Sequence, residues 1–185
     1  MKSSQSGFTL IELLVTTIVL SVGLLGLAQL EIFSIRHNHE AYLRSQATHL
    51  AQDIADRMRA NPQGVNNGDY ERLLLPKRIA ECIAPPGCSS SEMAQNDAWE
   101  WRISLGWQED PEDPLTGLPG GQGIVCLDST PQDGRRKDDH GCDASGTIYA
   151  IKIWWYEDRS HEEDEVLNNQ CGSKISRCFV TSFRP

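Results

Sequence analysis

The chain has 185 residues and a formal net charge of −9 at pH 7. This acidic balance argues against nucleic acid as a main partner, because binding phosphates requires a basic patch. The length is sufficient for one modest folded domain beyond a membrane segment.

The amino-terminal junction is the most informative feature of the sequence. A polar stretch whose only charge is Lys2 ends at Gly7, and Phe8 then opens an apolar run. Residues 8–33 supply the roughly 20 apolar residues that a helix needs to cross a bilayer. A secretory signal peptide would place its apolar segment before the cut. Here the apolar segment comes second, so we expect it to remain on the chain, with Lys2 on the cytoplasmic side.

Glu12 is an ionisable residue within this apolar run. A lone charged side chain in lipid costs roughly 3 kcal/mol on insertion scales. Two interpretations fit the residue. Glu12 lies near the helix end and reaches the aqueous interface, or it pairs with a positive charge when the helix assembles with others.

Helical periodicity continues beyond the membrane-length segment. Six apolar residues recur at helical spacing and form one stripe: Leu43, Ala47, Leu50, Ala51, Ile54 and Met58. The dipeptide Asn61-Pro62 ends the pattern, because the residue before a proline is disfavoured in the helical region. The sequence therefore predicts one continuous helix over about residues 9–60, with an apolar half and an amphipathic half.

The segments that follow are less regular. Residues 63–69 read as a polar turn and residues 85–91 as a loop. Residues 99–107 alternate as a strand would, whereas Trp101 and Leu105 fit helical spacing and Asn96-Asp97 is a good helix start. We favour a helix over residues 97–105.

Three later segments have strand character. Residues 124–127, 147–156 and 177–183 are rich in β-branched and aromatic side chains. The connecting segments are loops, and parallel pairing would require crossover helices. The sequence therefore predicts an α+β fold with a small antiparallel sheet, one face of which packs on the helix while the other is more exposed.

All six cysteines lie in the distal part of the chain. An even number in an exported domain favours disulfides. Several connectivities are possible, and the simplest joins sequence neighbours: Cys82 with Cys88, Cys126 with Cys142, and Cys171 with Cys178. No two cysteines have the CxxC spacing, which argues against zinc.

Patterns of catalytic or cofactor chemistry are weak. The five histidines show no metal-ligand spacing, and the glycines of residues 120–123 suit a turn better than a phosphate loop. Asp138, Asp139 and Asp143 lack the EF-hand pattern, so a solvated acidic loop is the better interpretation. We therefore expect no catalytic residue, no metal and no cofactor, and we disfavour a membrane-anchored enzyme.

Residues 6–12, Ser-Gly-Phe-Thr-Leu-Ile-Glu, with the uncharged run of residues 13–30, closely resemble the processing site of type IV pilins and of type II secretion pseudopilins. The resemblance implies that a prepilin peptidase cuts between Gly7 and Phe8 and methylates the new amino terminus. It also implies that Glu12 meets the free amino terminus of a neighbouring subunit.

The same resemblance implies a division of the chain into three parts. Residues 1–7 are the leader, and residues 8–34 are the transmembrane and assembly half of the helix. Residues 35–185 form a periplasmic globular domain that includes the amphipathic half.

Three further stretches resemble the PilV minor pilins, the type IV pilus modification family. They are residues 20–28, residues 41–48 continuing into 53–62, and Trp101 together with residues 118–123. The resemblance implies a type IV pilin-like fold, with the long amino-terminal helix packed on a small antiparallel sheet. In that family the tryptophan segment is usually helical, which supports our choice of a helix.

The resemblance also implies a function. The protein is expected to be a minor pilin that primes or caps the pilus fibre with other minor pilins and the major pilin, supporting twitching motility and adhesion. It would be a single-pass inner-membrane protein with a periplasmic domain, and after assembly it would lie in the fibre or at its tip. The alternative is a minor pseudopilin of type II secretion.

Overall fold

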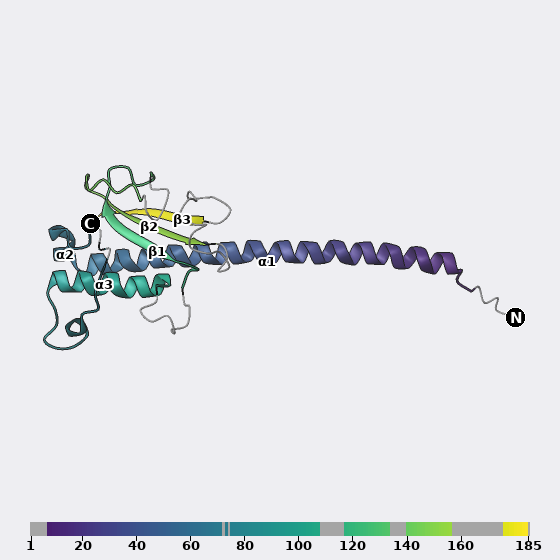
Figure 1. The fold of residues 1–185 in the computed structure, drawn as a ribbon, viewed down its shortest axis with the longest axis horizontal. Coiled ribbons are helices and arrows are strands. Elements are labelled where there is room, and N and C mark those ends of the chain that lie inside the picture. The colour runs from purple at the N-terminus through teal and green to yellow at the C-terminus, as the bar shows by residue number, and fades with distance from the viewer. Residues whose placement is uncertain are drawn as a thin grey trace. The chain divides into compact units, whose positions relative to one another are not determined.

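The computed structural model describes residues 7–71, 73, 75–107, 117–133, 140–156 and 176–184. The chain divides into two compact units, Met1–Tyr42 and Leu43–Pro185. Helix α1 (Leu10–Ala60) runs through both units. The second unit holds the other elements (Figure 1): α2 (Pro62–Asn67), the 3₁₀ helix η1 (Ala80–Ile83), α3 (Ser90–Leu105), β1 (Gln122–Leu127), β2 (Tyr149–Tyr156) and β3 (Ser176–Phe183).

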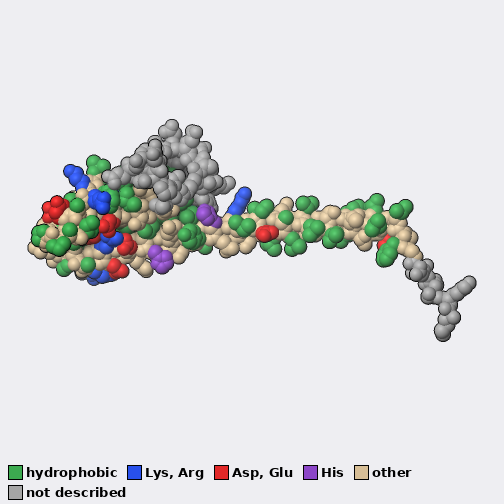
Figure 2. Space-filling view, turned by 90° about the horizontal axis from the view of Figure 1, so that it is seen from below, with side chains coloured by type: hydrophobic (Ala, Val, Ile, Leu, Met, Phe, Trp, Pro, Cys, Tyr) green, Lys and Arg blue, Asp and Glu red, His purple; other side chains and the backbone are tan. Residues whose placement is uncertain are grey.

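The described part of the first unit is the amino-terminal half of α1. Its side chains are exposed from residue 7 to residue 39. Figure 2 shows apolar side chains along the whole of this segment, with few charges between them. Among the described residues, α1 is the helix that is long and apolar enough to cross a membrane. The predicted apolar half of the helix is confirmed.

The amphipathic half of α1 is also confirmed, and it ends at Ala60 as predicted. The next residues differ from our expectation, because residues 63–69 contain the short helix α2 and not only a turn. Asn61 is its amino-terminal cap, accepting a hydrogen bond from the Gly64 N–H at 3.1 Å, and Pro62 occupies the first helical position. Both features favour a helix start.

Helix α3 confirms the helical interpretation of the tryptophan segment, but it begins at Ser90 and not at Asn96-Asp97. The Ser89 hydroxyl accepts from the Glu92 N–H at 3.3 Å, and the Glu92 carboxylate accepts from the Ser89 N–H at 2.8 Å. This capping box satisfies two backbone donors that would otherwise lack partners. The predicted loop over residues 85–91 is therefore wrong in its last two positions.

The three strands form the predicted antiparallel sheet in the order β1-β2-β3. Val125 of β1 and Thr181 of β3 both pair with Ile151 of the central strand. One face of the sheet packs on α1 and α3 in a core that includes Ile54, Met58, Trp101, Leu105, Val125, Ile151, Ile153, Trp155 and Phe183. The type IV pilin-like α+β class is confirmed.

Glycines allow α3 to approach the start of β1. A Cβ atom at Gly123 would lie 2.5 Å from the Trp101 ring, and one at Gly121 would lie 1.9 Å from the Leu105 carbonyl oxygen. Gly121 and Gly123 therefore serve close packing, since a side chain at either position would displace α3.

The second face of the sheet corrects our expectation of greater exposure. All eight residues of β2 are buried, including Ala150, Lys152 and Trp154, which do not face the helices. Lys152 is in contact with Asp133 and with the His140 carbonyl, both from the segment that follows β1. These described residues lie over Lys152, so β2 has two buried faces.

Candidate assembly site

The amino-terminal end of the described chain contains three residues that the sequence singled out. A Cβ atom built on Gly7 meets nothing within 4 Å, so packing within the chain does not require glycine there. Phe8 is 85% exposed. Both residues precede the first residue of α1, Leu10. A requirement for a small residue at Gly7 would therefore come from outside the folded chain.

Glu12 lies in the first turn of α1. Its backbone N–H is bound by the Thr9 carbonyl at 3.1 Å and by the Thr9 hydroxyl at 3.3 Å, so Thr9 caps the helix. The Glu12 side chain itself is exposed, near the positive end of the helix dipole, where a carboxylate is favourable. Glu12 is thus available to a partner outside the chain.

The hydroxyl groups of the apolar half are satisfied within the helix. Thr16, Thr17 and Ser21 donate to backbone carbonyls of the preceding turn at 2.6–3.0 Å. These residues therefore need no external hydrogen-bond acceptor. The carboxylate of Glu12 is the polar group near the start of this segment that the helix does not satisfy by itself.

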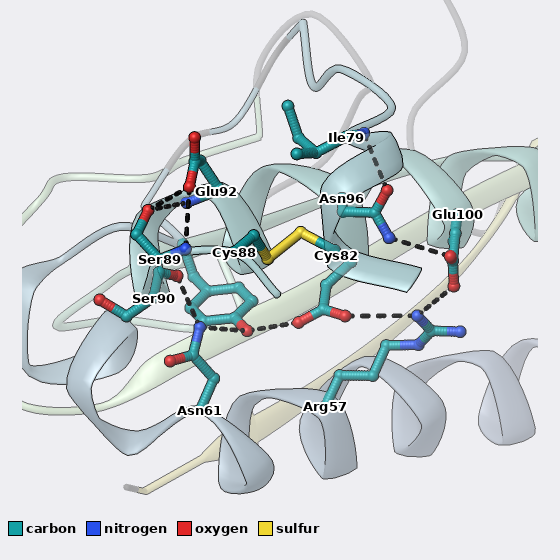
Figure 3. Close-up of a disulfide and its surroundings, with 12 residues drawn as sticks. Arg57, Asn61, Ile79, Cys82, Cys88, Ser89, Ser90, Glu92, Asn96 and Glu100 are labelled. Atoms are coloured by element: carbon teal, nitrogen blue, oxygen red, sulfur yellow. Dashed lines mark hydrogen bonds and ion pairs between the residues drawn. A yellow bond between two sulfur atoms is a disulfide. The ribbon is translucent and has the colours of Figure 1, made fainter. Parts of the chain in front are cut away.

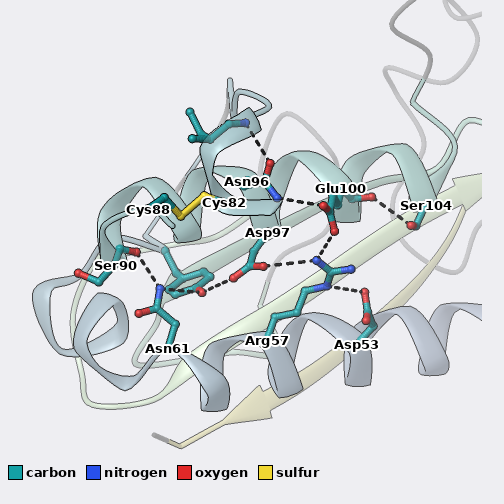
Figure 4. Close-up of polar contacts among 12 residues, drawn as sticks. Asp53, Arg57, Asn61, Cys82, Cys88, Ser90, Asn96, Asp97, Glu100 and Ser104 are labelled. Atoms are coloured by element: carbon teal, nitrogen blue, oxygen red, sulfur yellow. Dashed lines mark hydrogen bonds and ion pairs between the residues drawn. A yellow bond between two sulfur atoms is a disulfide. The ribbon is translucent and has the colours of Figure 1, made fainter. Parts of the chain in front are cut away.

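In the second unit, Arg57 joins α1 to α3 (Figure 4). Its guanidinium lies 2.6 Å from the Glu100 carboxylate, 3.3 Å from Asp97 and 3.1 Å from Asp53. The hydrogen bond from Arg57 lowers the pKa of Glu100 below its ordinary value. This network fixes the relative position of the two helices that pack on the inner face of the sheet.

A second set of hydrogen bonds connects the segment after α2 to α3 (Figure 3). The buried Tyr70 hydroxyl donates to Asp97 at 2.6 Å, and the Asn61 amide donates to the Tyr70 oxygen at 3.1 Å and to the Ser90 carbonyl at 2.7 Å. Burial raises the pKa of Tyr70, and the hydrogen bond to Asp97 raises it further. These contacts fix the end of α1 against the start of α3.

Two disulfides join sequence neighbours, as we expected. Cys82 bonds Cys88, between η1 and the start of α3 (Figure 3), and Cys126 bonds Cys142. None of the described cysteines is free. Cys171 lies outside the described residues, so its pairing with Cys178 stays a prediction.

One cluster has the composition of a metal site. Ligand atoms of Cys126, Asp128 and Cys142 lie within 4.8 Å of one another. Both sulfurs are bonded to each other, however, and a disulfide sulfur is not the thiolate that binds zinc. The cluster therefore does not fit a zinc site.

Lys152 is a buried charge that the sequence analysis missed. Its side chain and that of Asp128 are fully buried, and the ammonium nitrogen lies 2.5 Å from the Asp128 carboxylate. The ammonium also lies 3.3 Å from Asp133 and donates to the His140 carbonyl at 2.6 Å. A lysine within the most apolar strand was the available signal, because buried lysines require partners.

The comparisons with known proteins cover the amino-terminal part of the chain. Residues 2–28 match the prokaryotic N-terminal methylation motif, and residues 29–99 match the family described as Type IV pilin Tt1218. No curated protein and no solved structure matches the chain. The two matches meet within α1 and include Gly7, Glu12 and the capped start of α3, whereas the sheet lies beyond them.

Proposed function

We propose that this protein is a type IV pilin and hence a pilus component, and that it is a minor pilin of the PilV type; the matches to the N-terminal methylation motif and to the Type IV pilin Tt1218 family support the proposal. It is made as a single-pass inner-membrane precursor. After processing it joins other minor pilins and the major pilin in a complex that primes or caps the fibre. In that position it supports twitching motility and adhesion.

One observation carries the proposal: an exposed apolar helix begins just after Gly7 and Phe8 and bears Glu12 in its first turn. A helix that is apolar all round requires either lipid or other helices around it. The pilin uses both environments in turn, lipid before assembly and neighbouring helices afterwards. Glu12 leaves lipid together with the positive charge that it meets.

The proposed sequence of membrane insertion, processing and assembly divides the chain into three parts. Residues 1–7 are the leader that the prepilin peptidase removes, and residues 8–34 span the inner membrane and assemble. Residues 35–185 form the periplasmic globular domain. The two disulfides of that domain are consistent with an oxidising compartment outside the cytoplasm.

Deleting the gene tests the proposed role. We expect fewer surface pili and reduced twitching, with normal export of folded enzymes. Normal piliation with loss of enzyme export would instead assign the protein to a type II secretion system. Complementation with the intact chain controls for effects on neighbouring genes.

Replacing Gly7 with leucine tests the processing site. We expect the leader to remain on the chain, as measured by mass spectrometry of the membrane fraction. Gly23→Leu is the matched control, since a Cβ at Gly23 also meets nothing within 4 Å and the position lies far from the cut. A normal mature terminus at Phe8 in the Gly7→Leu variant would contradict the assignment.

Glu12→Gln tests the assembly contact, because it removes the charge and retains the shape. We expect normal membrane insertion, since an uncharged side chain is less costly in lipid. Incorporation into sheared pili should fall. Incorporation equal to that of the unaltered chain would mean that Glu12 only reaches the aqueous interface.

A further inference from the structure

A group of polar side chains begins where the apolar half of α1 ends. Residues 34–39, Ser-Ile-Arg-His-Asn-His, are all exposed, and they include one arginine and two histidines but no acidic residue. Arg36 is the first basic residue after Lys2. Because 3.6 residues make one helical turn, the side chains of Arg36, His37 and His39 point in three different directions around the axis. Residues 34–39 therefore form a collar around the helix.

The rise of the helix places this collar at one edge of a bilayer. Glu12 and Glu31 bound the uncharged run of residues 13–30, and the 19 positions from one to the other rise about 29 Å. This length matches the roughly 30 Å thickness of the hydrocarbon core. Arg36 lies five positions beyond Glu31, about 7.5 Å further along the axis. The headgroup layer is about 5–8 Å thick on each side, so the collar lies at the level of the headgroups.

The residues next to the collar suit the lipid side of that boundary. Ile32, Phe33 and Ile35 are apolar and more than half exposed. The Phe33 ring packs edge-on against the His37 ring, with 4.2 Å between the ring centroids. Rings with an apolar body and a polar edge favour the membrane–water interface. The contact therefore holds His37 at this boundary, where its ring N–H can donate to a headgroup oxygen.

Anionic phospholipid is the partner that fits the charge of the collar. Guanidinium groups bind phosphates through two parallel hydrogen bonds, and histidine and asparagine side chains supply further donors. None of the ion pairs in the described part of the chain involves Arg36. The nearest acidic residues lie at other levels: Glu31 is about 7.5 Å deeper, and the half-buried Glu40 is about 6 Å further out. Arg36 therefore meets the phosphates without a carboxylate at its own level.

We propose that residues 34–39 bind the headgroups of anionic phospholipids in the outer leaflet of the inner membrane, and that Arg36 selects their negative charge. The inference rests on the proposed function only for the insertion of residues 8–34 into that membrane. Processing gives the collar its role, because removal of the leader takes Lys2 away and leaves Arg36 as the first basic side chain. The collar then holds the processed subunit at its depth in the bilayer until assembly withdraws it.

Spin-labelled lipids test the collar on the purified full-length chain in phosphatidylcholine vesicles. Electron paramagnetic resonance compares the association of spin-labelled phosphatidylglycerol and phosphatidylcholine with the chain. We expect phosphatidylglycerol to be preferred, and Arg36→Gln should lower this preference about five-fold, the factor for one arginine near an anionic surface. Arg36→Lys should retain most of it, and high salt should weaken it.

Arg59→Gln is the matched control, because it also removes one exposed positive charge of α1, 23 residues further along the helix. It should leave the lipid preference unchanged. Positive charge at the other end of the membrane segment is the same in all these chains, so the comparison isolates the collar.

Three outcomes decide between the explanations. Equal association of both lipids, or the same preference in Arg36→Gln as in the unaltered chain, overturns the inference and leaves the proposed function intact. Reduced incorporation of Arg36→Gln into sheared pili with an unchanged lipid preference also overturns it, because the collar would then bind another protein. The expected lipid preference in a chain whose deletion leaves piliation normal would overturn the proposed function alone.

Discussion

Replacing Lys152 with methionine removes the positive charge from beneath the segment that follows β1. The Asp128 carboxylate then remains buried without its ion-pair partner, since both side chains are fully buried in the intact protein. Breaking a buried pair by removing one partner costs about 3–5 kcal/mol. A domain is stable by about 5–15 kcal/mol, so the variant should lose roughly a fifth or more of its stability.

The double variant Lys152→Met with Asp128→Asn separates the buried charge from packing. It removes both charges, and the carbonyl oxygen of the new side-chain amide can still accept the Thr130 N–H, which lies 2.9 Å from Asp128 in the intact protein. Asp133 is half-exposed and is hydrated again at little cost. Replacing a whole buried pair is often nearly neutral, so we expect stability within about 1 kcal/mol of the unaltered protein.

Denaturant unfolding of the purified full-length chain in detergent, followed by tryptophan fluorescence, measures both variants. Trp154 is a suitable reporter because it is buried in the same strand as Lys152. A single variant as stable as the unaltered protein would refute the reasoning. So would a double variant as unstable as the single one, since the loss would then come from packing and not from an unpaired charge.

Three other predictions use the same measurement. Ser89→Ala removes the side-chain half of the capping box and should cost about 1 kcal/mol. Because Arg57 lowers the pKa of Glu100, that pair stabilises the fold above the ordinary glutamate pKa of about 4.3 and loses its effect as the pH falls through the lowered pKa. The Arg57→Met variant should therefore be less stable than the unaltered protein at pH 7. The difference in stability between the two should narrow below about pH 4. Replacing Cys126 and Cys142 with serine should cost about 3 kcal/mol, the value for a closed loop of this size, and an unchanged unfolding midpoint would contradict a structural role.

Helix α1 could be predicted from the sequence because its signals are local. The apolar run, the stripe that includes Leu43 and Met58, and the Asn61-Pro62 stop are all set by neighbours within two turns. The antiparallel sheet followed from strand composition and from connecting segments whose sequences show no obvious helical pattern. The two disulfides in the described part of the chain join the nearest cysteines, so sequence distance alone identified them.

The start of α3 was missed although its signal was present. Ser89 and Glu92 have the spacing of a capping box, but Asn96-Asp97 also resembles a helix start and lies closer to the tryptophans. The structure buries Asn96 and Asp97 in mid-helix, where their side chains bind Glu100, Tyr70 and Arg57. Short polar residues favour caps because they hydrogen-bond nearby backbone. Here partners outside the helix bind them: Tyr70 and Arg57 are 27 and 40 residues from Asp97, and the Ile79 N–H, which donates to the Asn96 side chain, is 17 residues away.

The outer face of β2 could not be predicted for a related physical reason. Apolar and polar residues alternate along a strand only when one face of the strand is buried and the other meets water. Lys152 sits within an otherwise apolar strand, and its partners come from the preceding loop segment, whose path has no periodic signal. The two units therefore differ in how well their exposed side chains could be predicted, because among the described residues only the second unit has contacts between residues far apart in the sequence. In the first unit no described side chain is buried, so the pattern of apolar and charged residues in the sequence is also the pattern on the exposed surface. In the second unit, polar side chains that look exposed in the sequence are buried inside the fold, and their partners could not be read from the sequence.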